Sequence, residues 1–501
     1  MPNPLYDALF APLAGRETPL LIPPDGPPVS GAAFLALIAR TARALREAGL
    51  GPGDRLAVQV HKSPEALATY GAACALGAVY LPLNPAYTAA ELDHFLADAR
   101  PRLLLCDPAR VAALRPLADR YGAGVLSLNG PHGTLAEAAA HQPDRIAPVD
   151  RAPSDLAAIL YTSGTTGRAK GAMLTHANLL SNAETLARLW RFTPHDTLLH
   201  ALPIFHTHGL FVATNIALLT GGRMLFLPAF DPETVLRLLP QSTAMMGVPT
   251  FYTRLLADPR FDRAATVHMR VFISGSAPLL AETHAAFAER TGHRLLERFG
   301  MTETGMNTSH LYDGPRRAGT VGLPLPGVSL RLMAGEAEAP PGAVGEIEVR
   351  GPNVFAGYWQ NPGKTAEELR ADGWFRTGDL GVLGADGDLT IVGRAKDLII
   401  TGGYNVYPRE VELLLDAVPG VAESAVVGLP HPDFGEAVFA VLSPRPGLML
   451  DTAAVLAAVA PNLARFKQPK AAVVLAELPR NAMGKVQKAA LRETYRAWFG
   501  K

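Results

Sequence analysis

Short apolar runs alternate with amphipathic helical segments through the first third of the chain, and this alternation limits the possible folds. Residues 31–48 form a clear helical pattern, because Ser30 precedes them as a helix cap and Gly49 follows them. The expected strands are residues 56–60, 79–83, 103–106, 125–128 and 156–160, and further helices are expected at residues 64–76 and 177–190. Strands separated by helices are typical of parallel pairing. The sequence therefore predicts an α/β fold with layered, mainly parallel sheets.

The pattern changes near residue 340. Short strands with turn signals appear there, such as residues 346–349 and a hairpin-like pair around residues 385–388. A chain of 501 residues, of which 48% are hydrophobic, has room for one large folding unit and a smaller one. We therefore predict a large N-terminal domain at residues 1–394, with a β-rich subdomain, and a small α+β domain at residues 395–501.

Charge and cysteine content exclude several classes of protein. The chain has 46 basic and 46 acidic residues, so it offers no overall basic field for nucleic acid or an anionic membrane. Its two cysteines, Cys74 and Cys106, lack the spacing of metal ligands. The longest nearly apolar run, residues 71–83, is too short for membrane insertion, and the N-terminus does not resemble a signal peptide. We expect a cytoplasmic globular enzyme.

A loop rich in glycine and hydroxyl residues follows the strand expected at residues 156–160. It reads Tyr-Thr-Ser-Gly-Thr-Thr-Gly-Arg-Ala-Lys-Gly over residues 161–171 and lies between that strand and the next expected helix. Glycines let backbone N–H groups turn toward an anion, hydroxyls donate further hydrogen bonds, and a lysine adds positive charge. The residues expected to bind a polyphosphate are Thr162, Ser163, Gly164, Thr165, Thr166, Gly167 and Lys170. The loop matches neither a Walker A loop nor a GxGxxG motif.

This loop resembles the phosphate loop of the acyl-adenylate-forming superfamily, which includes acyl-CoA synthetases, adenylation domains and luciferases. Six further segments resemble motifs of the same superfamily in the same order: residues 202–209, 274–278, 297–303, 377–379, 393–394 and 479–485. One such match would be weak, but seven in sequence order identify the superfamily. The resemblance implies that ATP, Mg²⁺ and coenzyme A take part in the reaction.

The resemblance also implies roles for individual residues. His206 lines the acyl and adenylate pocket, and Lys485 stabilises charge on the α-phosphate during adenylation. The remaining residues expected around ATP are Ser276, Ala277, Glu297, Arg298, Phe299, Thr302, Asp379 and Arg394. Phe299 stands where the superfamily usually has a tyrosine, so the stacking face for adenine is kept and the hydroxyl is lost.

Three of these residues have roles that their chemistry supports directly. Thr302 offers a hydroxyl to the α-phosphate, and the carboxylate of Glu303 could hold Mg²⁺, with Thr166 as a second expected metal ligand. The carboxylate of Asp379 can accept hydrogen bonds from both hydroxyls of a ribose.

The two half-reactions of this superfamily require a mobile small domain. Adenylation needs Lys485 at the α-phosphate, whereas thioester formation needs an open channel for a thiol. The resemblance places the hinge at Lys396 and the wall of the pantetheine channel at Gly402 and Gly403, where absent side chains allow close approach. Lys467 is a further expected contact of coenzyme A.

The acid is expected to carry a second carboxylate. Arg254 lies four residues after Thr250, on one face of an expected helix, and a cation in an acyl pocket is unfavourable unless it is paired. This segment resembles malonyl-CoA synthetases, which implies that Arg254 binds the distal carboxylate while Thr207 and Met306 bound the space around C2. Arg298 is the rival for the distal carboxylate. The sequence thus predicts ATP-dependent ligation of malonate, with some tolerance of methylmalonate, to coenzyme A.

Three alternatives remain at this point. One is an acyl-CoA synthetase for another short-chain or aryl carboxylate. Another is an adenylation protein that loads a carrier-protein arm, and the third is a nucleotide-binding regulator without catalysis.

Overall fold

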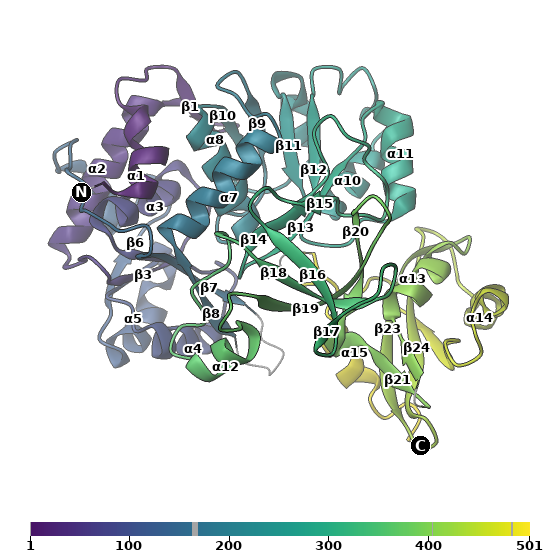
Figure 1. Cartoon of the computed structure of the whole chain (residues 1–501). Coiled ribbons are helices and arrows are strands. Elements are labelled where there is room, and N and C mark those ends of the chain that lie inside the picture. The colour runs from purple at the N-terminus through teal and green to yellow at the C-terminus, as the bar shows by residue number, and fades with distance from the viewer. Residues whose placement is uncertain (1, 163–168, 403, 482–483, 501) are drawn as a thin grey trace. The chain divides into compact units, whose positions relative to one another are not determined.

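The computed structural model describes residues 2–162, 169–402, 404–481 and 484–500, and it divides into two compact units (Figure 1). The first unit comprises Met1–Ala318, Gly322–Ser329 and Val349–Phe375. The second comprises Gly319–Val321, Leu330–Glu348 and Arg376–Lys501. The boundary expected at residue 394 falls within the second unit.

A six-stranded sheet in the first unit confirms the expected alternation of strand and helix. Its order is β6-β5-β3-β4-β7-β8, and all neighbours pair in parallel except β7 and β8. The strands are β3 (Arg55–Gln59), β4 (Val79–Pro82), β5 (Leu103–Cys106), β6 (Gly124–Ser127), β7 (Leu156–Thr162) and β8 (Lys170–Thr175). The helices α2 (Gly31–Glu47), α3 (Pro64–Leu76) and α7 (His176–Leu189) lie within one residue of their expected bounds.

Strand β8 corrects the expected setting of the phosphate loop. The loop does not lead from a strand into a helix. It joins two antiparallel strands that pair from Thr162 opposite Lys170 to Leu156 opposite Thr175, with a register shift between Leu156 and Ala158. The apolar run in β8 is short and ends directly at the cap of α7, so the sequence alone does not distinguish it from the loop. Anion binding here cannot therefore rely on a helix N-terminus.

A nine-stranded sheet forms the other half of the first unit. Its order is β15-β14-β13-β12-β11-β9-β10-β1-β2, and the strands from β13 to β1 are parallel. The strands are β1 (Pro19–Ile22), β2 (Val29–Ser30), β9 (Thr197–His200), β10 (Arg223–Phe226), β11 (Ala244–Gly247), β12 (Val271–Ser274), β13 (Leu296–Met301), β14 (Gly305–Ser309) and β15 (Leu323–Pro324). The carboxyl ends of β9, β11, β12 and β13 therefore share one edge of the sheet.

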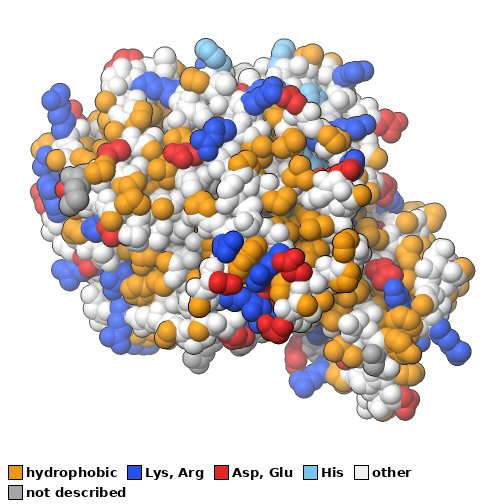
Figure 2. Space-filling model, in the orientation of Figure 1, with side chains coloured by type: hydrophobic (Ala, Val, Ile, Leu, Met, Phe, Trp, Pro, Cys, Tyr) orange, Lys and Arg blue, Asp and Glu red, His pale blue; other side chains and the backbone are white. Residues whose placement is uncertain are grey.

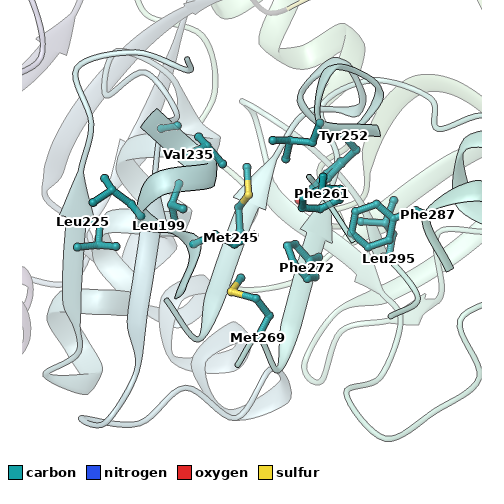
Figure 3. Packing of buried hydrophobic residues seen from close by; sticks show 14 of the residues in the cluster. Leu199, Leu225, Val235, Met245, Tyr252, Phe261, Met269, Phe272, Phe287 and Leu295 are labelled. Atoms are coloured by element: carbon teal, nitrogen blue, oxygen red, sulfur yellow. The ribbon is translucent and has the colours of Figure 1, made fainter. Parts of the chain in front are cut away.

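Aromatic packing fixes the helices against this sheet (Figure 3). The ring of Phe272 on β12 meets that of Phe287 at a centroid distance of 5.0 Å, and Tyr252 meets Phe287 at 5.4 Å. Tyr252 lies on α10 (Pro249–Leu256), and Phe287 lies on α11 (Ala281–Thr291). The hydroxyl of Tyr252 also donates to the carbonyl of Ile273 at 2.6 Å. The rotation of α10 about its axis is thereby set, because Tyr252 and Leu255 must face the core.

The second unit contains two antiparallel-rich sheets. The first has the order β17-β16-β18-β19-β20, and the turn at residues 385–388 joins β19 (Phe375–Leu383) to β20 (Leu389–Arg394), which confirms the expected hairpin. Its other strands are β16 (Ser329–Ala334), β17 (Ala337–Glu338) and β18 (Gly345–Arg350). Figure 2 shows a mixed group of basic and acidic side chains over β16, β18 and β19. Beneath the surface, Arg331 on β16 pairs with the buried Glu348 on β18 at 2.6 Å.

The second sheet of this unit has the order β22-β21-β24-β23, with β25 also paired to β24. The strands are β21 (Ile399–Thr401), β22 (Tyr404–Val406), β23 (Val421–His431), β24 (Gly435–Pro444) and β25 (Ala471–Val474), and the helices are α13 (Pro408–Asp416), α14 (Thr452–Val459) and α15 (Lys488–Tyr495). The predicted fold class, a large α/β part and a small α+β part, is confirmed. In the part of the chain that the structure describes, no helix is long and apolar enough to cross a membrane.

Candidate active site

The shared edge of the nine-stranded sheet brings together four segments that are far apart in the sequence. Ligands of open α/β sheets bind outside the carboxyl ends of the parallel strands. The segments that leave β9, β11, β12 and β13 at that edge are residues 201–209, 248–250, 275–277 and 302–304. They contain the expected residues His206, Thr207, Ser276, Ala277 and Thr302.

Arg298 on β13 is a buried cation at this edge. It is 4% exposed, and among the described residues no carboxylate pairs with it and its Nε has no hydrogen-bond partner. Burial lowers the pKa of Arg298 to about 9, so the group stays positively charged at neutral pH. Its Nη2 donates to the hydroxyl of Ser276 at 3.3 Å. A buried charge without a counter-ion is unstable and therefore suits an anionic ligand.

His208 lies near this cation, and Thr207 precedes it in the chain. The hydroxyl of Ser276 is 3.2 Å from Nδ1 of His208, and Ser276 has a φ of +73°, which is rare for a residue other than glycine. Burial and the charge of Arg298 lower the pKa of His208 well below its usual value, so its ring is neutral. Within the described residues, Nε2 of His208 and the hydroxyl of Thr207 are buried without a partner. The site thus offers one cation and three polar groups from three segments.

Glu303 and Lys170 are joined through two residues that the sequence analysis did not identify, Tyr358 and Glu368. The hydroxyl of Tyr358 lies 3.1 Å from Oε1 of Glu303 and 2.6 Å from Oε2 of Glu368. Nζ of Lys170 is 3.4 Å from Glu368 and 4.5 Å from the centre of the Tyr358 ring. Burial and the charge of Glu303 raise the pKa of Tyr358, which keeps its hydroxyl a donor. Tyr358 and Glu368 therefore hold both residues in one network.

The donor set around Glu303 fits Mg²⁺ only if a substrate supplies further ligands. In the described ranges, no group of three or more His, Cys, Asp and Glu side chains could hold a metal. Glu303 accepts a hydrogen bond from Thr162 at 3.3 Å and is 5% exposed. Mg²⁺ is commonly held by one or two carboxylates together with substrate phosphates and water. Glu303 meets this requirement if ATP brings the phosphates.

Most of the expected phosphate loop, including Ser163, Gly164, Thr165, Thr166 and Gly167, lies outside the described residues. Both of its ends are fixed by side chains. The hydroxyl of Tyr161 donates to Asp98, and Nε2 of His94 is 2.8 Å from the carbonyl of Ala169.

The remaining expected residues of the first unit differ in their exposure. Glu297 and Met306 are buried, Phe299 and Thr302 are half-buried, and Thr207, Thr302 and Gly305 line a cavity of about 10 Å³.

Arg254 lies on the face of α10 opposite Tyr252 and is exposed. In a helix with 3.6 residues per turn, positions 252 and 254 point to nearly opposite sides. Because Tyr252 packs into the core, Arg254 faces outward. The spacing of Thr250 and Arg254 places them on one face, but it does not tell which face meets the core.

In the second unit, the buried Asp379 on β19 pairs with the partly exposed Arg394 on the neighbouring strand β20. Nε of Arg394 is 2.9 Å from Oδ1 of Asp379, which is 4% exposed. Burial raises the pKa of Asp379, and the charges of Arg394 and Lys485 oppose that rise. The backbone N–H of Asp379 donates to the hydroxyl of Thr377 at 3.1 Å. These two expected residues are therefore adjacent.

The other expected residues of this unit lie on loops. Lys396 is in a short helical turn, Ala395–Asp397, where burial and the charge of Arg394 lower its pKa. Gly402 has a φ of +57° and donates its N–H to the carbonyl of Phe434 at 2.8 Å, whereas Gly403 lies outside the described residues. Lys467 is paired with Glu410, with Nζ at 2.6 and 2.8 Å from the two carboxylate oxygens. Lys485 is exposed, and its N–H donates to the side chain of Asn481 at 3.0 Å.

Comparisons with known proteins identify the family of the chain. The description "AMP-binding enzyme" matches residues 21–359, and "AMP-binding enzyme C-terminal domain" matches residues 410–485. The crystal structure of ATP-bound MatB from Rhodopseudomonas palustris is 53% identical, with a TM-score of 0.97 and all of both chains covered.

Two curated relatives differ in the acid that their names give. A feruloyl-CoA synthase from an Amycolatopsis species is 38% identical and covers 91% of this chain and 92% of its own. The mitochondrial malonate–CoA ligase of Bos taurus is 36% identical and covers 84% of this chain and 78% of its own. These matches confirm the predicted superfamily. The chain belongs to the family of AMP-binding enzymes and is an ATP-dependent, AMP-forming acyl-CoA ligase.

Proposed function

We propose that the acid is malonate, that methylmalonate is accepted to some degree, and that the product is malonyl-CoA. The observation that carries this proposal is Arg298, a buried cation at the ligand-binding edge of the sheet with which no carboxylate of the described residues pairs. A second carboxylate on the substrate would neutralise it, and a guanidinium can bind a carboxylate with two parallel hydrogen bonds. The malonate–CoA ligase relative supports the same acid.

The first half-reaction joins the acid to ATP. One carboxylate of malonate attacks the α-phosphorus of ATP, malonyl-AMP forms, and pyrophosphate leaves. Residues 162–167 and Lys170 bind the phosphates, Glu303 and Thr166 hold Mg²⁺, and Thr302 and Lys485 bind the α-phosphate. Backbone and ring contacts to adenine come from Ser276, Ala277, Glu297 and Phe299, while Asp379 binds the ribose next to Arg394. Electrostatic stabilisation of this kind is the main contribution that proteins make to phosphoryl chemistry.

The acid itself is held by Arg298, and Arg254, which faces outward from α10, is the second candidate for the distal carboxylate. His206 lines the pocket, and Thr207 and Met306 bound the space around C2. One methyl group in such a space is worth only about 1–3 kcal/mol of discrimination, so methylmalonate is tolerated.

The second half-reaction transfers the acyl group to coenzyme A. The thiol attacks the carbonyl of malonyl-AMP, malonyl-CoA forms, and AMP leaves. We propose that residues 395–501 act as the mobile domain with Lys396 as the hinge, and that Gly402 and Gly403 line the channel. Lys467 would have to exchange Glu410 for a phosphate of coenzyme A. A cytoplasmic location remains a prediction.

The test is pyrophosphate release with MgATP across acetate, butyrate, ferulate, sulfoacetate, malonate, methylmalonate and succinate, with and without coenzyme A. We expect the highest kcat/KM for malonate and sustained turnover only with coenzyme A. The highest kcat/KM for ferulate would instead indicate an aryl acid as the substrate, and Arg298 would then have no second carboxylate to bind. Turnover with a carrier protein in place of coenzyme A would support the loading of a carrier, and no release with any acid would support a regulator.

Gly275 provides a separate test of the geometry around Arg298. A Cβ at this position would lie 2.4 Å from Cζ of Arg298, so Gly275→Ala must displace the guanidinium. We expect kcat/KM for malonate to fall on the order of 10- to 100-fold, because small displacements of a binding group are amplified in the transition state. Turnover of butyrate should change little. Equal losses for both acids would mean that Arg298 does not contact the second carboxylate.

A further inference from the structure

Lys62 is a lysine whose donors are all directed at one distant segment. It follows β3 and is half-buried. Its Nζ donates to the carbonyl of His200 at 2.7 Å and to the carbonyl of Leu202 at 2.9 Å, and it lies 2.9 Å from Nδ1 of His200. Nζ is also 4.3 Å from the centre of the Phe226 ring. Burial lowers the pKa of Lys62 well below its usual value. Burying the amino group of Lys62 costs free energy, and its hydrogen bonds offset that cost.

These contacts assign the tautomer of His200. Nζ of Lys62 lies within 2.9 Å of three partners, which matches the three N–H donors of an ammonium group, so Nδ1 of His200 accepts and its ring proton lies on Nε2. Nε2 is 2.9 Å from the carbonyl of Gly209 and 3.0 Å from the hydroxyl of Thr214. Burial and the charge of Lys62 hold the pKa of His200 well below its usual value, so the ring stays neutral. Lys62 thereby directs a hydrogen bond to Gly209.

Gly209 ends the segment that begins after His200. The hydroxyl of Thr214 also donates to the carbonyl of Gly209, at 2.9 Å. A Cβ on Gly209 would lie 2.0 Å from the carbonyl oxygen of Pro203, so the segment closes tightly on itself. It continues into a π-helix, His208–Thr214, a geometry that is frequent at functional sites.

A cavity of about 80 Å³ lies beside this segment, and its lining includes Lys62, Pro203, Ile204 and Phe205. Further along the segment come His206, Thr207 and His208, and His208 contacts Ser276, which contacts Arg298. The polar anchors at the two ends therefore act together with the packing of the buried Leu202 and Ile204 to place the segment.

We propose that Lys62 and His200 are positioning residues of the acyl pocket. Through residues 201–209 they set the location of Thr207 and His208, and thereby determine which acid fits. The choice of acid rests on the function proposed above, but the positioning role applies to whichever acid the enzyme prefers.

The test compares Lys62→Met, His200→Gln and Thr214→Val with the unchanged enzyme, using steady-state kinetics for the acids above. For Lys62→Met we expect kcat/KM for the preferred acid to fall about 10- to 100-fold. The KM for ATP should stay within about twofold, and the ratio of malonate to methylmalonate should change about threefold or more. His200→Gln keeps a hydrogen-bond donor for the carbonyl of Gly209, so its kcat/KM for the preferred acid should fall less than that of Lys62→Met. Thr214→Val removes one hydroxyl only and should shift the acid ratio in the same direction, even if Lys62→Met fails to fold.

Leu114→Ala is the matched control. Leu114 is fully buried in another cluster of the same unit, so this change lowers Tm without altering residues 201–209. It should leave the ratio between acids unchanged. Lys62→Met and Thr214→Val with unchanged acid ratios, or with losses shared equally by ATP and acid, would overturn the proposal. If the unchanged enzyme prefers another acid, the malonate function fails while the same ratios still test Lys62.

Discussion

Replacing Lys485 with alanine is expected to stop adenylation while leaving thioester formation intact. A positioned ammonium that stabilises charge on the α-phosphate contributes on the order of 10²- to 10³-fold to the rate of that step. Pyrophosphate release with malonate and MgATP should therefore fall by about this factor. Formation of malonyl-CoA from supplied malonyl-AMP should continue near its original rate. In that step the thiol attacks the carbonyl carbon and AMP is the leaving group, so no bond to the α-phosphorus forms or breaks.

Lys470→Ala is a suitable control for that experiment. Lys470 lies in the same unit and is exposed, and its Nζ donates to the carbonyl of Arg465 at 3.3 Å and lies 5.7 Å from the centre of the Phe434 ring. Its loss should leave both half-reactions unchanged. If Lys485→Ala slows both half-reactions equally, its role is in folding or in binding the adenylate. If it slows neither, the proposed catalytic assignment is wrong.

The helices were predicted well where capping residues mark their ends in the sequence. Helix α3 has the expected bounds, because Ser63 and Gly77 cap it, and the side chains of Thr88 and Glu91 form a capping box at the start of the next helix, Ala89–Ala99. These signals are local, so the sequence displays them. Strand β8 was missed because its partner β7 lies across the phosphate loop, and pairing between strands is not a local signal.

The chemistry of the candidate site was less predictable than its motifs. The sequence motifs identified Glu303 and Lys170. They did not identify Tyr358, which joins the two, because it lies 55 residues from Glu303 in the sequence. The contact between Lys62 and His200 spans 138 residues. Arg254 shows a second limit of sequence analysis. Helical spacing places Thr250 and Arg254 on one face of α10, but only the packing of Tyr252 shows that Arg254 is exposed. Side-chain partners of this kind depend on tertiary structure.

Replacing Arg298 with methionine is expected to remove malonate activity selectively. Losing one partner of a buried, charged hydrogen bond costs about 2–5 kcal/mol, which corresponds to a fall in kcat/KM of at least about 30-fold. Butyrate, which has no second carboxylate, should be used as well as before or better, because the variant no longer buries an unpaired cation beside it. Arg298→Lys keeps the charge but loses the planar guanidinium, so its malonate activity should lie between those of the unchanged enzyme and Arg298→Met. Steady-state kinetics with both acids provides the measurement.

The stability of the same variant separates binding from folding. Arg298 is buried without a carboxylate partner in the described structure, so its charge weakens the ligand-free fold. The Tm of Arg298→Met should therefore stay the same or rise, while malonate should no longer raise it. Arg254→Ala, at an exposed position, should keep the Tm and lose less malonate activity than Arg298→Met. The reverse order of activities would assign the distal carboxylate to Arg254, and malonate activity retained in both variants would exclude a cation clamp and, with it, the argument for a dicarboxylate.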